Sequence, residues 1–263
     1  MKSASIRPAV VSGSFYPKDP QQLRGLIDRF LSAAQKTRHS PKALIAPHAG
    51  YVYSGPVAAR AYVSLENRKA PVERVVLVGP SHRVAFNGLA LCGASYYSTP
   101  LGRIPIDVEA QKLLMNLQGV IISDEAHAYE HSLEVHLPFL QRILGEFKLI
   151  PLVAGNAPAN QVAELVDCLW GGDETLIVIS TDLSHYHDYA TACRLDSATS
   201  HAIEACAWRE LDFESACGRV PLSGLLYSAK ARNMSAITLD LRNSGDTAGS
   251  RDRVVGYGAY LLH

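Results

Sequence analysis

Three apolar segments of the sequence end in the same way, with polar side chains placed shortly after each segment. The pairs of segment and side chain are 43–46 with His48, 74–78 with His82, and 175–179 with Asp182 and His185. Imidazole and carboxylate groups bind transition metals, and histidine also transfers protons near neutral pH. A lone histidine after a strand is most often a hydrogen-bonded loop residue. Three at equivalent places indicate a shared pocket.

The elements that must position these side chains alternate between strands and helices. Short apolar runs predict buried strands, and stretches of helical spacing lie between them. This alternation predicts an α/β fold with a mostly parallel or mixed central sheet and helices on both faces. Ligands of such sheets bind beyond the carboxyl ends of the strands, so the three histidines and the aspartate are expected to converge at one edge. No change of composition divides the chain, so residues 1–263 are expected to form a single domain.

A second concentration of histidine and acidic residues spans residues 124–136. His127 and His131 have the i, i+4 spacing of a metal pair on a helix. The apolar pattern of a helix, expected from Ser132 to Leu144, starts only after His131. His127 is therefore expected in a polar loop whose Glu and His side chains face water, while His131 could reach the pocket from the start of the helix.

Charge and composition exclude several classes of function. The chain has 25 basic and 25 acidic residues, so its net charge is zero with neutral histidine. Binding to nucleic acid or to an anionic membrane as the main activity would need a positive excess. No apolar run is long enough to span a bilayer, and Arg7 and Pro8 interrupt the stretch where a signal peptide would be apolar. We therefore expect no nucleic-acid or membrane partner and a cytoplasmic location.

Cysteine and glycine patterns are less informative. The five cysteines are widely spaced and contain no CxxC pair, which argues against a disulfide framework or a four-cysteine zinc site. Cys217 alone would be read as a core residue. The glycine-containing loop 244–249 lacks the strand–GxGxxG–helix context of a nucleotide site and is expected to be a turn between strands at 236–241 and 254–261.

Read together, the motifs are similar to those of one known family. In chain order they are APHAGY at 46–51, GPSH at 79–82, TPLG at 99–102, EHSLEVHLP at 130–138, STDLSH at 180–185 and CGR at 217–219. From about Arg7 to the carboxyl terminus the sequence resembles the Memo family, whose bacterial members are often called AmmeMemoRadiSam system protein B. That family resembles the class III extradiol dioxygenases, which are non-haem iron enzymes, and the resemblance implies their fold.

The resemblance also implies roles for individual residues. His48, His82 and Cys217 match the Memo metal ligands, Asp182 and His185 match polar residues beside the metal, and His131 matches a pocket histidine. His185, His131 and Asp182 are thus the candidates for proton transfer. The dioxygenases use two histidines and a carboxylate, whereas here the third ligand would be a thiolate, unless Asp182 supplies it. Iron(II) is the expected cofactor, and the softer thiolate also admits copper or zinc.

The resulting hypothesis is a metal-dependent redox enzyme that acts with oxygen on an unknown small substrate. Two alternatives stay open: a non-catalytic protein that binds a (phospho)peptide or partner in the same pocket, and a zinc hydrolase. The family label further implies a radical-SAM protein and an AMMECR-type protein as partners.

Overall fold

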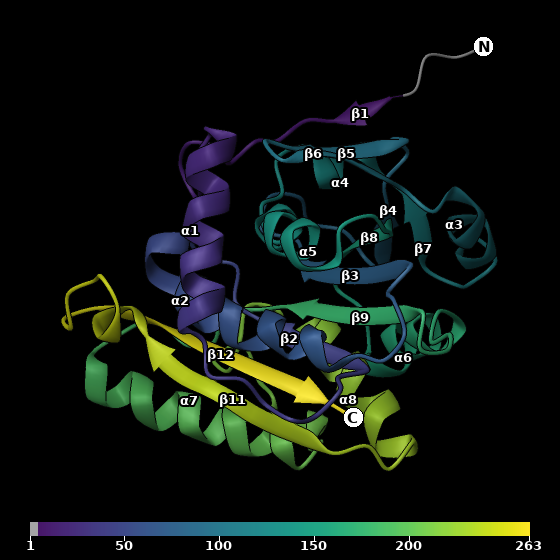
Figure 1. Ribbon diagram of the computed structural model, residues 1–263. Coiled ribbons are helices and arrows are strands. Elements are labelled where there is room, and N and C mark those ends of the chain that lie inside the picture. Colours follow the sequence, from purple (N-terminus) through teal and green to yellow (C-terminus); the bar gives the residue numbers. More distant parts are fainter. Residues whose placement is uncertain (1–4) are drawn as a thin grey trace.

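A nine-stranded mixed sheet forms the centre of the computed structural model, which describes residues 5–263 (Figure 1). Its strands are β2 (Ala43–Ala46), β3 (Arg74–Pro80), β4 (Leu89–Leu91), β7 (Val120–Ile122), β8 (Lys148–Ala154), β9 (Thr175–Ser180), β10 (His185–His187), β11 (Ala236–Asn243) and β12 (Val254–Leu262). The order is β10-β12-β2-β9-β3-β8-β4-β7, with β11 paired to β12. The inner strands β2, β9, β3 and β8 are parallel, and β12 and β4 flank them in antiparallel pairing. The predicted parallel or mixed sheet is confirmed.

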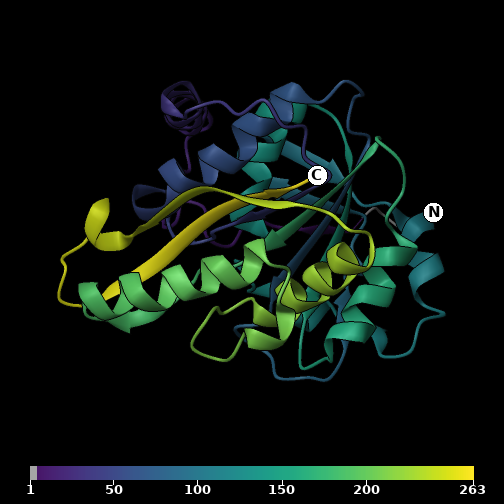
Figure 2. The same cartoon turned by 90° about the horizontal axis from the view of Figure 1, so that it is seen from below.

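Helices cover both faces of this sheet, as the sequence predicts. One face carries α1 (Pro20–Ala33), α2 (Tyr51–Tyr62) and α5 (Leu137–Leu144), and the other carries α3 (Val108–Leu114), α6 (Ala159–Cys168), α7 (Tyr189–Glu204) and α8 (Arg219–Ala231). In Figure 2 the purple and blue helices lie on one side of the strands and the green helices on the other. Successive strand residues point to opposite faces, so Leu44 packs in the first core and Ile45 in the second. A strand buried on both faces must be apolar at every position, which explains the uninterrupted apolar runs.

Smaller elements complete the chain. A three-stranded sheet contains β1 (Ile6–Arg7), β5 (Tyr96–Thr99) and β6 (Gly102–Pro105). The short helix α4 (Asp124–Ala128) and four 3₁₀ helices, η1 (Val63–Asn67), η2 (Glu134–His136), η3 (Trp208–Glu210) and η4 (Ser244–Asp246), lie between the larger elements. The loop 244–249 connects β11 to β12, as predicted.

The structure corrects two local predictions. The helix expected from Ser132 to Leu144 is split into η2 and α5, and Pro138 lies in the first turn of α5, where a missing N–H costs no hydrogen bond. His127 belongs to α4 instead of a loop.

Two further expectations can be compared with the structure. All five cysteines are free, so the prediction of no disulfide framework is confirmed. Among the helices of residues 5–263, none combines the length and the apolarity that crossing a membrane requires.

Candidate metal centre

Three parallel strands deliver polar side chains to one edge of the sheet. β2, β3 and β9 are neighbours in register, and their carboxyl ends point the same way. His48, His82 and Asp182 each lie two residues beyond the end of their strand. The regular spacing follows from the parallel arrangement, because strands that end together place equivalent loop residues together.

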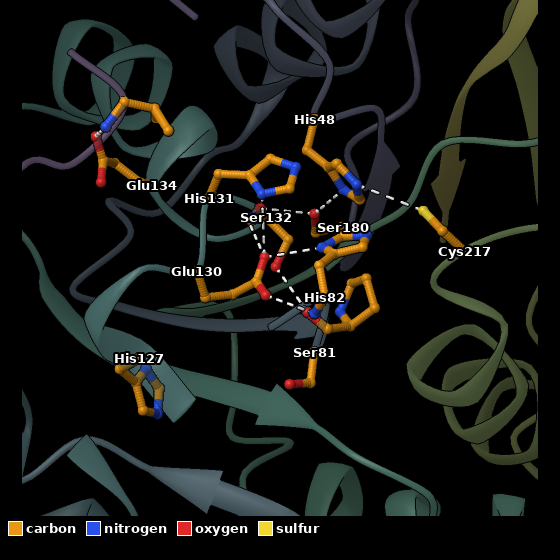
Figure 3. Close-up of polar contacts among 12 residues, drawn as sticks. His48, Ser81, His82, His127, Glu130, His131, Ser132, Glu134, Ser180 and Cys217 are labelled. Atoms are coloured by element: carbon orange, nitrogen blue, oxygen red, sulfur yellow. Dashed lines mark hydrogen bonds and ion pairs between the residues drawn. The ribbon is translucent and has the colours of Figure 1, made fainter. Parts of the chain in front are cut away.

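A third histidine lies at this edge of the sheet, although it does not follow one of the three strands. His131 lies in the loop between α4 and η2, and its ring centroid is 5.4 Å from that of His48 and 4.7 Å from that of His82. One ligand nitrogen from each of the three rings lies within 4.8 Å of the other two. Figure 3 shows the three rings turned toward a common centre. Such a group can hold a metal ion.

Hydrogen bonds fix which nitrogen of His48 is free. Ser180 donates its hydroxyl proton to the carbonyl oxygen of Ser132 at 2.7 Å, so its oxygen must accept from His48 Nδ1, which lies 2.6 Å away. Nδ1 therefore carries the proton and Nε2 keeps a lone pair. His48 is only 2% exposed, so this tautomer is held rigidly.

Glu130 fixes His82 in the same way. Its carboxylate accepts from His82 Nδ1 at 2.9 Å, from the His82 backbone N–H at 2.6 Å and from the Ser132 backbone N–H at 2.9 Å (Figure 3). It also lies 3.4 Å from His131 Nδ1. Burial would raise the pKa of Glu130, but hydrogen bonds and the charge of His82 outweigh it and hold the pKa at about 2. A buried carboxylate behind two imidazoles is the arrangement that orients histidine ligands and makes them better donors.

Cys217 lies beside His48, just before α8. Its Sγ is 3.4 Å from His48 Nε2 and accepts from the Asp182 backbone N–H at 3.3 Å. The next residue, Gly218, packs so closely against β9 that a Cβ atom there would lie 2.5 Å from the Ser180 carbonyl oxygen. Only glycine allows this approach, and the approach brings the thiol to the histidine.

Asp182 faces the same centre from β9. Its Oδ1 accepts from the His48 backbone N–H at 2.8 Å and from the Ala49 backbone N–H at 3.3 Å, while Oδ2 lies 3.8 Å from His48 Nε2. Burial raises the pKa of Asp182 to about 7, although the two backbone hydrogen bonds work against it. Near neutral pH this carboxyl group can therefore either hold or release a proton.

Burial controls the charge of the remaining groups in the absence of a metal. It lowers the pKa of His48 well below its ordinary value, with His82 and His131 adding repulsion, and lowers the pKa of His131 to about 4. Burial and Asp182 raise the pKa of Cys217 to about 12. Neutral imidazoles are the form that binds metals, and a coordinated thiol loses its proton to the ion.

These side chains form the floor of a cavity of about 840 Å³. His185, from β10, lines it as well, and burial lowers its pKa. The walls and rim also include Phe15, Tyr53, Arg83, Tyr186, Phe213, Ser244, Gly249, Arg253 and Tyr257. The volume lies within the range of small-molecule sites.

The structure thus brings all six sequence-predicted site residues to one cavity. His131 was predicted as a residue for proton transfer, and its ring lies in one group with those of His48 and His82. Sequence reasoning missed Ser180 and Glu130, which orient His48 and His82. The pairing of Glu130 with His131 in the EHS motif was a usable signal. Sequence reasoning also treated the loop 244–249 as a plain turn, yet Ser244 and Gly249 line the cavity.

His127 does not take part in this centre. It is fully buried, donates from Nε2 to the Ala90 carbonyl oxygen at 2.9 Å and accepts at Nδ1 from the Tyr97 hydroxyl at 2.6 Å. Both nitrogens are used, so no lone pair remains for a metal pair with His131. The expectation that the Glu and His side chains of this region face water holds for Glu125, which is exposed, and is wrong for Glu130 and Glu134, which are buried like His127.

Residues 7–16, here called the amino-terminal strap, hold the loop that carries Glu130 and His131. Arg7 donates to the carbonyl oxygens of His127 and Glu130 and forms a buried ion pair with Glu134. Glu134 in turn accepts from the backbone N–H groups of residues 10 and 11 and from the Tyr16 hydroxyl at 2.6 Å.

The strap also reaches the rings themselves. The Phe15 ring packs on His131 with centroids 4.9 Å apart, and its carbonyl oxygen accepts from the Tyr51 N–H at 2.8 Å, close to His48. One segment from the start of the chain therefore holds two loops that carry candidate metal-binding histidines.

Known proteins resemble the chain over most of its length. A family model described as "Memo-like protein" matches residues 7–261. A MEMO1 family protein of Aquifex aeolicus is 36% identical, with 96% of this chain and 97% of that protein covered. A MEMO1 family protein of Methanopyrus kandleri is also 36% identical, with 97% and 98% covered.

A solved structure resembles the fold. The crystal structure of an uncharacterized protein from Escherichia coli K12 matches with a TM-score of 0.56 at 15% identity, covering 85% of this chain and 100% of that chain. At this identity the likeness concerns the arrangement of sheet and helices alone.

Proposed function

This chain belongs to the Memo-like protein family, and from that premise we propose that it binds a divalent transition metal through His48, His82 and Cys217 and uses it in redox chemistry on a small organic substrate. The observation that carries the proposal is that one nitrogen each of His48, His82 and His131 lies within 4.8 Å of the other two, while Nδ1 of His48 and of His82 is hydrogen-bonded to Ser180 and Glu130. Rings held in this way are already oriented, with a lone pair on the other nitrogen free for an ion.

The donor set fits a metal of intermediate softness. Two neutral imidazoles and one thiolate leave a divalent ion with net positive charge and open coordination positions. When bound, iron(II), our first choice, or copper supplies redox chemistry toward oxygen, whereas zinc would supply Lewis acidity for hydrolysis.

Cys217 and His131 compete as the third donor. Nitrogen and sulfur ligands on one tetrahedral ion are separated by roughly 3.5 Å, from bond lengths of about 2.05 and 2.3 Å. The 3.4 Å between His48 Nε2 and Cys217 Sγ agrees with that separation. His131 lies within the three-histidine group, which does not include Cys217. We assign the third position to Cys217 and proton transfer to His131, His185 and Asp182.

Metal analysis of anaerobically purified protein tests the site. His48→Ala and His82→Ala should lose bound metal, whereas His201→Ala, an exposed histidine on α7, should keep it. Wild-type metal content in both site variants would refute the proposal.

Cobalt substitution separates the two third donors. The wild-type protein should show a thiolate-to-cobalt charge-transfer absorption that Cys217→Ser abolishes and His131→Asn retains. Absence of this absorption from the cobalt-loaded wild-type protein, together with loss of bound cobalt in His131→Asn, would place His131 on the ion instead.

Oxygen uptake tests the redox chemistry. The iron-loaded protein is expected to consume oxygen with some member of a catechol and enediol panel. Metal binding without uptake would favour a non-catalytic binding protein, and zinc-dependent hydrolysis without oxygen would favour a hydrolase. The cytoplasmic location stays a prediction from the pattern of the amino-terminal residues, and the radical-SAM and AMMECR-type partners stay predictions carried by the family resemblance.

A further inference from the structure

The cavity has a charge that the whole chain does not have. The sequence balances 25 basic against 25 acidic residues, yet the cavity lining has two arginines against one aspartate, and the remaining titratable groups at its floor include histidines that burial keeps neutral. Glu130 lies behind the histidines and is only 1% exposed, so it does not offset this charge at the surface of the cavity. A divalent metal ion would add to the positive potential.

In the order of the strands across the sheet, the two arginines lie on opposite sides of the candidate metal centre. Arg83 follows His82 beyond the end of β3, and Arg253 precedes β12. β12 is antiparallel, so its first residues lie at the edge where the parallel strands end. β2 and β9 lie between β12 and β3 in the sheet, so the two arginines come from strands on opposite sides of those that lead to His48 and Asp182, and both line the cavity. A small molecule above the metal centre would lie between them.

In the described part of the chain, neither arginine has an acidic partner. Within residues 5–263 no carboxylate lies at ion-pair distance from Arg83 or Arg253, whereas Arg7, Arg74 and Arg142 each have one. The guanidinium of Arg253 is 5.4 Å from the Tyr186 ring centroid, which leaves its N–H groups available. Both side chains are exposed at the cavity rim.

Aromatic side chains form the rest of the rim. Tyr186 is 64% exposed and Phe213 84% exposed, and both line the cavity together with Tyr53. Tyr186 has φ of 63°, a left-handed backbone conformation that is uncommon for a bulky residue and is concentrated at functional sites. Exposed rings around a concave site bind flat apolar groups.

From this charge and these rings we propose that the ligand is a small organic anion with a flat apolar body, whose carboxylate or phosphate is bound by Arg83 and Arg253 while the body rests on Tyr186 and Phe213. This inference rests on the proposed function, since the metal centre forms the floor of the same cavity. Arginine pairs with both headgroups through two parallel hydrogen bonds.

Calorimetric titration with benzoate, phenylphosphate and the neutral benzyl alcohol tests the inference. At least one anion should bind the metal-loaded protein about tenfold or more tightly than the alcohol. The tighter of the two anions identifies the headgroup. Equal affinity for all three probes would overturn the inference.

Arginine variants separate this contact from direct binding of the anion to the metal. Arg83→Gln and Arg253→Gln should each raise the anion Kd about tenfold and leave metal content unchanged. Arg24→Gln, an exposed arginine on α1, is the matched control and should change neither. An unchanged anion Kd in the double variant would overturn the inference.

Measuring anion binding to metal-free protein distinguishes failure of the metal proposal from failure of the anion proposal. Arg83 and Arg253 are still present there, so the preference for an anion over benzyl alcohol should persist at reduced strength. Loss of metal from the wild-type protein with this preference intact would count against the metal proposal alone. Full metal content without the preference would count against the anion proposal alone.

Discussion

The inner wall of the cavity is its floor at the strand ends, and the outer wall is its rim. The two differ in whether their polar side chains have hydrogen-bond or ion-pair partners within the protein. On the inner wall, His48, His82 and Asp182 are held by hydrogen bonds from or to neighbouring protein groups. On the outer wall, Arg83 and Arg253 have no carboxylate partner in the described part of the chain, and Phe213 is largely exposed. The difference separates two tasks. A wall that binds an ion works best when its donors are already fixed in place, whereas a wall that binds a ligand must leave donors free for it.

The largest expected effect comes from removing the support of the inner wall. Arg7→Met leaves the buried Glu134 carboxylate without its cation, and breaking such a pair costs about 3–5 kcal/mol of unfolding free energy. Arg142→Met, which removes an exposed pair with Asp28, should cost about 0–1 kcal/mol. Chemical denaturation of both variants measures the difference, and similar losses would show that the strap does not stabilise the site.

A smaller effect is expected from the carboxylate behind the histidines. Glu130→Gln keeps the shape of the side chain but removes the charge that orients His82 and His131. Metal affinity should fall about 10–100-fold, as for other carboxylates that support histidine ligands. Chelator competition measures the affinity, with the exposed Glu109→Gln as control. An unaltered affinity would mean that the rings are oriented by packing alone.

Acid should lower the unfolding free energy through the buried side chain of His127. Burial lowers the pKa of His127 to about 4, while in the unfolded chain it lies near 6.5. Between these values the unfolded state binds the additional proton, so stability is lost as pH falls below about 6.5 and the loss is complete near pH 4. At pH 5 this histidine alone contributes a loss of about 2 kcal/mol relative to pH 7.

The variant His127→Asn isolates that contribution. Its unfolding free energy should change less between pH 7 and pH 5 than that of the wild-type protein. Parallel pH profiles for the two proteins would contradict the assignment of His127 as a neutral, fully paired side chain.

The smallest effect on stability belongs to the outer wall. Arg83→Gln removes no ion pair of the described residues, so its unfolding free energy should stay within about 0.5 kcal/mol of the wild type. Thermal denaturation measures this directly. A loss comparable to that of Arg7→Met would erase the distinction between the two walls.

The part of the site that depends on parallel strands could be predicted from sequence. Each of the three apolar runs is continuous because both faces of its strand are buried. The end of each strand can therefore be recognised in the sequence as the end of the apolar run. His48, His82 and Asp182 follow at once from the rule that such ends share one edge. The same signal explains why the overall α/β arrangement was predictable.

The supporting groups could not be found in this way. Glu130 is buried where His82, distant in the sequence, hydrogen-bonds to it, whereas local composition alone indicates an exposed loop. Arg7 and Glu134 are separated by 127 positions, and neither has an apolar pattern around it that indicates a buried ion pair. Short strands such as β1 and β10 are similarly fixed by pairing partners, since two or three residues carry no periodicity.

The amino-terminal strap has a consequence for how the protein is made and handled. The residues that it grips, 127–134, are synthesised long after it, and Cys217 later still. A nascent chain therefore cannot complete the cavity until most of the polypeptide has left the ribosome. For the same reason, trimming the first sixteen residues to obtain a shorter recombinant version would remove Phe15 from the cavity lining and the contacts that hold residues 127–134, although the proposed metal ligands lie far along the chain.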